Sequence, residues 1–195
     1  MTRDLSTPPT LTPGSLGGSP QPVIRAAGGL VLRPWERGDS PVFLSAYGDP
    51  EIQRWHTRRP STEGQVREWF EAYARDWQRE SGGHWAVTGD GGEVRGRIAL
   101  RGMEFGDGIA EAAYWVLPAA RGAGVASGAL AALSAWALEE AGFWRLELDH
   151  STGNHASCAV ATKCGYVLEG VKRSAGLQHD DGRHDMHLHA LVRGR

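Results

Sequence analysis

The residues whose types and spacing most clearly suggest a binding function are the small and basic ones of the segment Arg121–Ala126, RGAGVA. An aromatic and β-branched run, Tyr114–Leu117, precedes this segment, and an alanine- and leucine-rich helix is predicted after it. The N-terminus of a helix has unpaired N–H groups and a partial positive charge, which together bind anions, phosphate above all. Gly122 and Gly124 leave room for a diphosphate, and Arg121 adds a guanidinium for its oxygens. The segment therefore predicts a phosphate-binding loop.

The spacing of this loop excludes two common phosphate motifs. A Walker loop needs GxxxxGK[ST], and the dinucleotide fingerprint needs a third glycine at a spacing that is absent here. Two alternatives stay open: the glycines form a plain turn before an ordinary helix, or the loop binds the phosphates of a nucleotide such as ATP.

A second motif follows the predicted helix. The stretch Asn154–Gly170 reads NHASCAVATKCGYVLEG, with an NxxS start, a KxGY centre and an EG end. Together the two motifs resemble the GNAT N-acetyltransferase superfamily, and the second resembles its RimJ/RimL-type branch. The resemblance covers about residues 29–193.

Composition limits the classes of protein that fit. The chain has 195 residues, 41% of them hydrophobic, and a net charge of −2, so it shows no basic footprint for nucleic acid or an anionic membrane. No apolar run approaches a membrane span, and the N-terminus lacks an apolar signal core. The two cysteines, Cys158 and Cys164, are read as reduced packing residues, and we expect a cytoplasmic protein.

The predicted domain organisation is a tail followed by one domain. Residues 1–22 are rich in Pro, Gly, Ser and Thr and are expected to be disordered or loosely held. Residues 23–195 are expected to form a GNAT acetyltransferase domain of the α/β class.

The pattern of elements predicts a mixed, mostly antiparallel sheet of seven strands with flanking helices. Because the predicted helix after the loop connects two neighbouring strands, those two strands should run parallel at the centre of the sheet. The resemblance implies that they splay apart. The expected strands are 29–35, 84–88, 94–105, 109–117, 145–150, 166–170 and 185–192. The expected helices begin near 39, 50, 62, 126 and 154.

The resemblance implies acetyl-CoA as co-substrate, with its pantetheine arm in the gap between the splayed strands. In relatives the main chain of the strand before the loop pairs with this arm, which here corresponds to Val116 and Leu117. Asn154 and Ser157 match positions that touch CoA, although Asn154 also suits a helix N-cap. The resemblance implies that the CoA diphosphate is bound by Arg121, Gly122, Ala123, Gly124, Val125 and Ala126.

The reaction implied by the resemblance is direct attack of an amine on the acetyl thioester in a ternary complex. A backbone amide near Val116 is the expected donor to the oxyanion. Many GNAT enzymes carry a tyrosine seven residues after the helix asparagine, as the acid for the thiolate. That position is Ala161 here, so we expect Ser157 to replace it, directly or through water, or no acid to be needed.

Three residues are candidates for the general base that accepts the proton of the amine. Glu111 lies on the strand before the splay, and Asp149 and His150 lie at the end of the next parallel strand. His150 has a suitable intrinsic pKa. Each of them also fits a solvated or salt-bridged strand end.

The C-terminal region is rich in histidine, but we expect no metal. His187 and His189 share a strand face, which fits sheet packing or pocket lining better than a ligand set. The segment Gln178–His184 is expected to form a hairpin loop over the acceptor site, where its acidic residues would suit a cationic amine.

The sequence therefore predicts an acetyl-CoA-dependent N-acetyltransferase whose acceptor is a primary amine, either a protein N-terminus or a small molecule. The main alternative keeps the fold without the chemistry, as an acyl-CoA-binding sensor or regulatory module. No nucleic-acid or membrane partner is expected, and the resemblance leaves a homodimer open.

Overall fold

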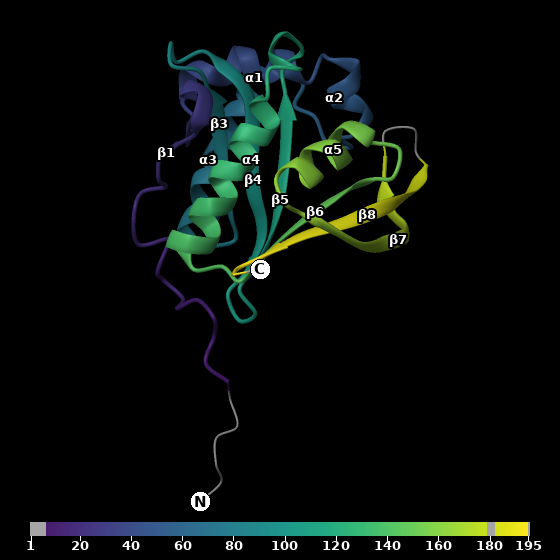
Figure 1. Ribbon diagram of the computed structural model, residues 1–195. Helices are drawn as coiled ribbons and strands as arrows, with labels where there is room; N and C mark the ends of the chain where they lie inside the picture. The colour runs from purple at the N-terminus through teal and green to yellow at the C-terminus, as the bar shows by residue number, and fades with distance from the viewer. Residues whose placement is uncertain (1–6, 179–181, 195) are drawn as a thin grey trace, which may run out of the picture.

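A single mixed sheet is the centre of the molecule, for which a computed structural model describes residues 7–178 and 182–194. The strand order is β1-β2-β3-β4-β5-β6-β8-β7 (Figure 1). All neighbours are antiparallel except β5 and β6, which are parallel as predicted. The strands are β1 (Ile24–Arg25), β2 (Val31–Pro34), β3 (Gly82–Thr88), β4 (Val94–Glu104), β5 (Ile109–Val116), β6 (Arg145–Ser151), β7 (Val167–Leu177) and β8 (Arg183–Val192).

The described sheet has eight strands, not the seven we predicted. The additional strand is β1, whose two residues pair with Val31 and Leu32 of β2. Two residues are too few to show an alternating pattern, so periodicity could not reveal this strand. β7 also runs on to Leu177, beyond the predicted end at residue 170, because it forms a long hairpin with β8.

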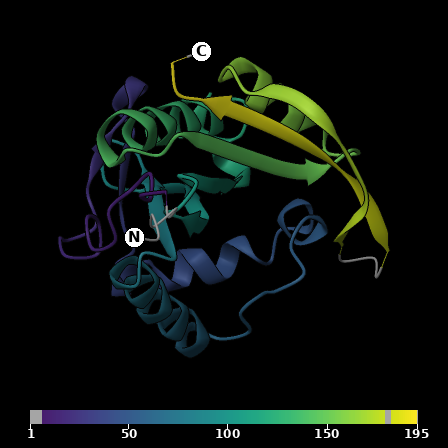
Figure 2. The same ribbon diagram turned by 90° about the horizontal axis from the view of Figure 1, so that it is seen from below.

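Helices cover both faces of the sheet. α4 and α5 lie on one face, and α1, α2 and α3 lie on the other (Figures 1 and 2). No helix in the described part of the chain is both long enough and apolar enough to cross a bilayer. The α-helices are α1 (Ser40–Ala46), α2 (Pro50–Arg54), α3 (Glu63–Gln78), α4 (Val125–Ala135) and α5 (His155–Lys163), and a π-helical turn, η4 (Trp136–Ala141), continues α4.

The parallel pair separates partway along its length. β5 and β6 pair only between Ile109–Glu111 and Arg145–Glu147. The remaining residues of β5, 112–116, keep their partners in β4 but have none in β6. The predicted splay is therefore present, and it begins immediately after Glu111.

Two apolar clusters hold the helices against the sheet. Beneath α4, fully buried Leu130 and Leu133 pack with Trp85 of β3. On the other face, Phe43 of α1 packs with Trp115 of β5 at a ring-centroid separation of 5.7 Å. Because neighbouring residues of a strand point to opposite faces, β5 contributes to both layers and carries side chains to either side of the gap.

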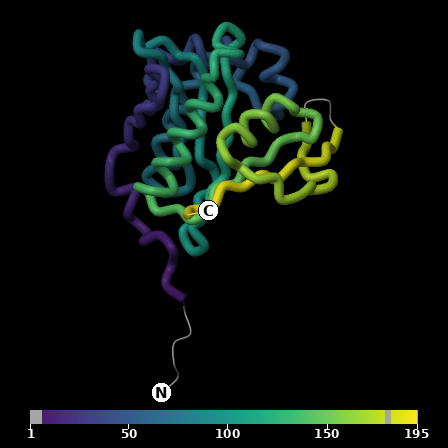
Figure 3. The backbone as a smooth tube through the Cα atoms, in the orientation of Figure 1, coloured from purple at the N-terminus to yellow at the C-terminus, as the bar shows by residue number. Residues whose placement is uncertain are grey.

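We predicted a disordered or loosely held tail over residues 1–22, and the described part of it, residues 7–22, makes several contacts with the domain. Residues 7–22, called the strap below, lie along the domain before entering β1 (Figure 3). The Glu80 carboxylate accepts hydrogen bonds of 2.6 to 2.9 Å from three strap amides. The indole N–H groups of Trp77 and Trp85 donate to strap carbonyls at 2.7 and 2.8 Å. Tryptophan N–H groups need partners when they are buried, and here the polar strap supplies them.

Candidate active site

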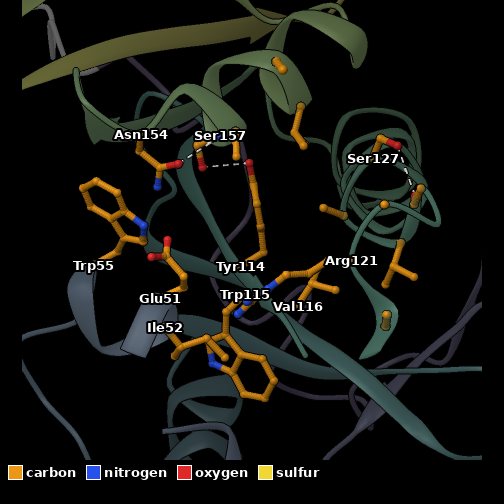
Figure 4. A pocket seen from close by; sticks show the side chains of 18 of the residues that line it. Glu51, Ile52, Trp55, Tyr114, Trp115, Val116, Arg121, Ser127, Asn154 and Ser157 are labelled. Atoms are coloured by element: carbon orange, nitrogen blue, oxygen red, sulfur yellow. Dashed lines mark hydrogen bonds between the residues drawn. The ribbon is translucent and has the colours of Figure 1, made fainter. Parts of the chain in front are cut away.

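A cavity of about 500 Å³ opens where β5 and β6 separate. It is lined by residues of α2, the end of β5, the glycine-rich loop, the start of α4 and the length of α5 (Figure 4). Most of the predicted CoA-binding residues line it, namely Val116, Arg121, Gly122, Gly124, Val125, Ala126, Asn154 and Ser157. Leu117 and Ala123, which we also predicted, are absent from the described lining.

The N-terminus of α4 faces this cavity without a side-chain cap. Gly124 is the N-cap in a left-handed conformation with φ of 77°, and Gly122 has φ of 76°. A Cβ placed at Gly122 would meet no atom within 4 Å, so backbone conformation, more than crowding, calls for glycine there. Since no acidic side chain occupies the first turn, its amides and dipole are available to an anion.

The main chain of β5 points the Val116 amide into the gap. The Leu117 amide donates to the Arg95 carbonyl of β4 at 2.9 Å, and the Leu117 carbonyl accepts from the Ala120 amide at 2.9 Å. Both main-chain groups of Leu117 are therefore already paired. In an antiparallel ladder consecutive residues alternate in direction, so the Val116 amide points away from β4 and toward the splay. Of the two predicted main-chain contacts, the geometry favours Val116.

Arg121 is tied to α2 across the mouth of the cavity. Its guanidinium hydrogen-bonds the Asp49 carboxylate at 2.5 Å. Asp49 is also the N-cap of α2 and accepts from the Ile52 amide at 3.0 Å. The same ion pair thus fixes the glycine-rich loop relative to the helix that carries Ile52 and Trp55 into the cavity.

The start of α5 brings a hydroxyl pair to the opposite wall. Asn154 caps α5 by accepting from the Ser157 amide at 3.1 Å, as the N-cap alternative predicted. The Ser157 hydroxyl lies 3.0 Å from the Tyr114 hydroxyl, which reaches across from β5 (Figure 4). Burial raises the pKa of Tyr114 to about 12, so the phenol stays protonated. Sequence reasoning missed Tyr114 because we treated its run only as a buried strand.

Ala161, where the resemblance led us to look for an acidic tyrosine, is part of the core. Ala161 is fully buried and packs in the cluster beneath α4. Ala161 does not line either described cavity, whereas Tyr114 of β5 brings a hydroxyl to the first one.

The three predicted bases are engaged elsewhere and do not line either described cavity. Glu111 forms an ion pair with Arg101, at the last paired position before the splay. Asp149 accepts a hydrogen bond of 2.7 Å from Lys172. His150 is buried and bonds the Ser151 carbonyl through Nδ1 at 2.8 Å.

A second cavity, of about 390 Å³, adjoins the first on the α1–α3 side. Trp55 and His56 line both cavities. Trp69 and Tyr73 of α3 line the second cavity, whereas Val66 of the same helix is buried in the apolar cluster on this face of the sheet.

His56 lies where the two cavities meet, and a hydrogen bond fixes the tautomer of its ring. Its Nδ1 lies 2.7 Å from the Ile52 carbonyl, which can only accept, so Nδ1 carries the proton and Nε2 keeps a lone pair. Burial lowers the pKa of His56, a tendency that the Ile52 carbonyl opposes and Arg97 and Arg101 reinforce. The ring is therefore neutral near pH 7 and able to accept a proton. The isolated His56 followed no motif, which is why the sequence did not single it out.

The second cavity carries a buried positive charge. The Arg97 side chain is buried and stacks over Tyr73, with its guanidinium carbon 5.5 Å from the ring centroid. It donates to His84 Nδ1 at 2.9 Å, and burial together with Arg97 and Arg101 lowers the pKa of His84 to about 2. His84 is thus neutral, and the Nε atom of Arg97 has no hydrogen-bond partner among the described residues. The acidic loop that we expected over the acceptor includes residues 179–181, which lie outside the described residues.

Comparison with known sequences decides the family. Residues 29–167 match the family described as Acetyltransferase (GNAT) domain. The chain belongs to the GNAT acetyltransferase family. This GNAT chain is 29% identical over 102 residues to YdaF of Bacillus subtilis (strain 168), a protein provisionally named a ribosomal N-acetyltransferase. The match covers 52% of this chain and 55% of YdaF, so the chain spans about half the length of that relative.

Solved structures share the fold of this GNAT domain. A RimL ribosomal L7/L12 α-N-protein acetyltransferase in complex with CoA superposes with a TM-score of 0.82 at 20% identity, covering 88% of this chain and 98% of that one. RimJ of Mycobacterium smegmatis, in complex with a CoA disulfide, gives a TM-score of 0.79 at 20% identity, covering 95% of this chain and 90% of that one. The predicted GNAT fold, with its mixed sheet and parallel pair, is confirmed.

Proposed function

We propose that this protein transfers an acetyl group from acetyl-CoA to a primary amine by direct attack in a ternary complex. The observation that carries the proposal is the splay-site cavity, which combines an uncapped helix N-terminus with an unpaired strand amide. The amides at 125–127 and the loop glycines suit the diphosphate. The gap beyond Glu111 suits the pantetheine arm, with the thioester near Val116.

Two negative charges develop during transfer, and different groups stabilise them: the Val116 amide acts on the oxyanion, and the Ser157–Tyr114 hydroxyl pair acts on the thiolate. The Val116 amide is the donor to the oxyanion, an interaction worth roughly 3–4 kcal/mol in acyl transfer. Ser157 donates to the departing thiolate while it accepts from the Tyr114 phenol. This assignment keeps our expectation that Ser157 replaces the family tyrosine and adds Tyr114 as the group that orients it.

His56 is the general base in this proposal. It lines both cavities and so lies between the cofactor side and the acceptor side. Its bare Nε2 and lowered pKa suit removal of the amine proton as the C–N bond forms. Glu111, Asp149 and His150 are less suited because each is held by another partner away from the cavities.

The lining of the second cavity favours an acceptor that bears an anionic group near its amine. Arg97 is buried without a carboxylate partner among the described residues. Arg58 and Arg101 line the same cavity, together with one acidic residue, Asp76, and Arg101 is ion-paired with Glu111. A buried guanidinium without a counter-charge is unfavourable, and a carboxylate of the acceptor would relieve this. An N-terminal peptide with acidic residues meets the requirement better than a polyamine.

The deciding experiment measures binding and turnover separately. In calorimetry, acetyl-CoA and CoA should bind tightly, and ATP should bind weakly or not at all. A higher affinity for ATP than for acetyl-CoA would favour a nucleotide-binding protein. Thiol release is then followed with N-terminal peptides that differ only in an acidic or basic second residue. We expect turnover, with kcat/KM about tenfold higher for the acidic peptide.

Two outcomes distinguish the alternatives. Tight acetyl-CoA binding without turnover of any amine would support the sensor alternative and contradict the enzyme. Turnover with a preference for basic peptides or polyamines would keep the enzyme and overturn the anionic acceptor.

A further inference from the structure

Four metal-ligating side chains meet between α5 and the sheet, outside both cavities. They are called the histidine–cysteine cluster and consist of His150 from β6, His187 and His189 from β8, and Cys158 from α5. Their ligand atoms all lie within 4.8 Å of one another. His150 pairs directly with His187 across the β6–β8 ladder, and His189 returns to the same face two residues later. The cluster therefore joins α5 to the paired strands β6 and β8.

Two of the four cluster side chains are buried, the other two are half-buried, and some of their polar atoms lack partners. His150 is 5% exposed and His189 is 1% exposed. Nε2 of His150 and Nδ1 of His187 have no hydrogen-bond partner among the described residues, whereas the main chain of Tyr166 interacts with the His189 ring. Each unsatisfied buried polar group costs about 1–3 kcal/mol, so something must compensate for this arrangement. A bound cation that takes ring lone pairs would do so.

The hydrogen bonds around the cluster orient it for ligation. Nδ1 of His150 lies 2.8 Å from the Ser151 carbonyl, which places the proton on Nδ1 and the lone pair on Nε2. Histidines that bind metals commonly donate their second N–H to a carbonyl in this way. Nε2 of His189 lies 3.7 Å from the Cys158 sulfur. With ordinary Zn–N and Zn–S bond lengths, a tetrahedral site sets nitrogen and sulfur about 3.6 Å apart.

We propose that the histidine–cysteine cluster is a structural site for Zn²⁺ or a similar divalent transition metal. Three imidazoles and one thiolate complete a tetrahedral shell, and small inward shifts from the 4.8 Å limit close it. Cys158 loses its thiol proton to solvent as the metal–sulfur bond forms. Because the protein fills all four positions, the metal holds elements together and does not activate water.

The position of the cluster gives the metal a structural consequence. Cys158 follows Ser157 directly on α5, and β6 continues from the splay into His150. A metal there would pin α5, and with it the wall of the cavity, to the β6–β8 pair. Our sequence expectation of no metal considered only the C-terminal histidines, and neither Cys158 nor His150 was joined to them.

Cobalt provides a direct readout that does not depend on acetyl transfer. The full-length protein, stripped with a chelator and reduced, is titrated with Co²⁺ and followed by absorption. We expect saturation at one equivalent, the intense visible bands of tetrahedral Co²⁺ and a thiolate-to-metal charge-transfer band. Zn²⁺ should then displace the Co²⁺ and raise the Tm of the protein.

Ligand and control variants test whether the metal binds at the histidine–cysteine cluster. Cys158→Ser should abolish the charge-transfer band and weaken Co²⁺ binding more than about 100-fold, because loss of even a group that only orients a ligand costs about 10- to 100-fold. Cys164→Ser, on the same short segment but outside the cluster, should leave both unchanged, as should His155→Gln at an exposed position of α5. His187→Asn serves as a second ligand variant if Cys158→Ser folds poorly. Absence of stoichiometric binding by the wild-type protein, or an unchanged spectrum in Cys158→Ser, would overturn the proposal.

Discussion

At the scale of single residues, the candidate site depends on groups whose roles come from their neighbours. A serine on a helix becomes a thiolate donor only when a phenol orients it, and a lone histidine becomes a base only when a carbonyl fixes its tautomer. Both conditions are met here, by Tyr114 for Ser157 and by Ile52 for His56.

The hydroxyl pair predicts non-additive losses of activity. Ser157→Ala and Tyr114→Phe should each lower kcat about 10- to 100-fold, because a hydrogen bond to a charged group is worth about 1.5–3 kcal/mol. The double variant should be little worse than the poorer single one, since both act through one hydrogen bond to the thiolate. Thr162→Ala, which removes an exposed hydroxyl of α5, is the matched control. Fully additive losses would show that the two hydroxyls act separately.

His56 predicts a pH signature. Burial lowers the pKa of His56 from its usual value, so the base is neutral at neutral pH and loses activity as the pH falls through the lowered pKa. The acidic limb of the kcat–pH profile should disappear in His56→Gln, and kcat at pH 7.5 should fall about 10²- to 10⁴-fold. The basic limb of kcat/KM set by the amine itself should persist. An unchanged acidic limb in the variant would exclude His56 as the base.

At the scale of elements, the site exists because a strand pair opens beside a helix start. β5 keeps β4 along its length but leaves β6 after Glu111, which frees the Val116 amide. α4 begins at a left-handed glycine with no capping side chain, which frees the amides of its first turn. The proposed binding of acetyl-CoA requires both elements, the helix start for the diphosphate and the open strand for the thioester.

We expect a substitution in the glycine-rich loop to lower CoA affinity beyond its effect on stability. Gly124→Glu should weaken CoA binding by roughly 100-fold or more, because it sets a carboxylate beside the diphosphate at the helix N-terminus. Gly92→Glu is a matched control, since Gly92 also has positive φ, 82°, in a turn outside both cavities. Both variants should lose similar Tm from backbone conformation, but only the first should lose affinity in calorimetry. Equal affinity in the two proteins would mean that the loop does not hold the diphosphate.

At the scale of the whole molecule, the strap joins the two helical layers. It provides carbonyls for Trp77 of α3 and Trp85 of β3, and Leu11 is buried in the cluster beneath α4. A segment that looked too polar to fold is therefore held by side chains of the domain.

The strap predicts a pH-dependent stability difference. Hydrogen bonds from the strap amides outweigh the effect of burial and lower the pKa of Glu80 below 4.5. A lowered folded-state pKa means that the stabilisation is complete above pH 4.5 and disappears as the pH falls through the lower value. Glu80→Gln should reduce the free energy of unfolding at pH 7 by about 1–2 kcal/mol, measured by urea denaturation. The difference should shrink toward zero in acid below that pKa, whereas Glu140→Gln, at an exposed position, should change little at either pH. A difference that persists in acid would point to another cause.

The sequence by itself determined the family, the order of the main elements and most of the conformation of the glycine-rich loop. These features are local: left-handed glycines, capping residues and strand patterns act over a few residues, so Gly124, Asn154 and the RGAGVA loop could be read directly. The two-residue β1 could not be, because it has no pattern of its own.

Only the tertiary structure decided which side chains meet. Tyr114 and Ser157 are 43 residues apart, and the histidine–cysteine cluster gathers ligands from β6, α5 and β8. The three predicted bases were plausible from strand position, yet ion pairs and burial hold them away from the cavities. Such contacts depend on the register of the strands and the packing of helices onto them, which no local pattern specifies.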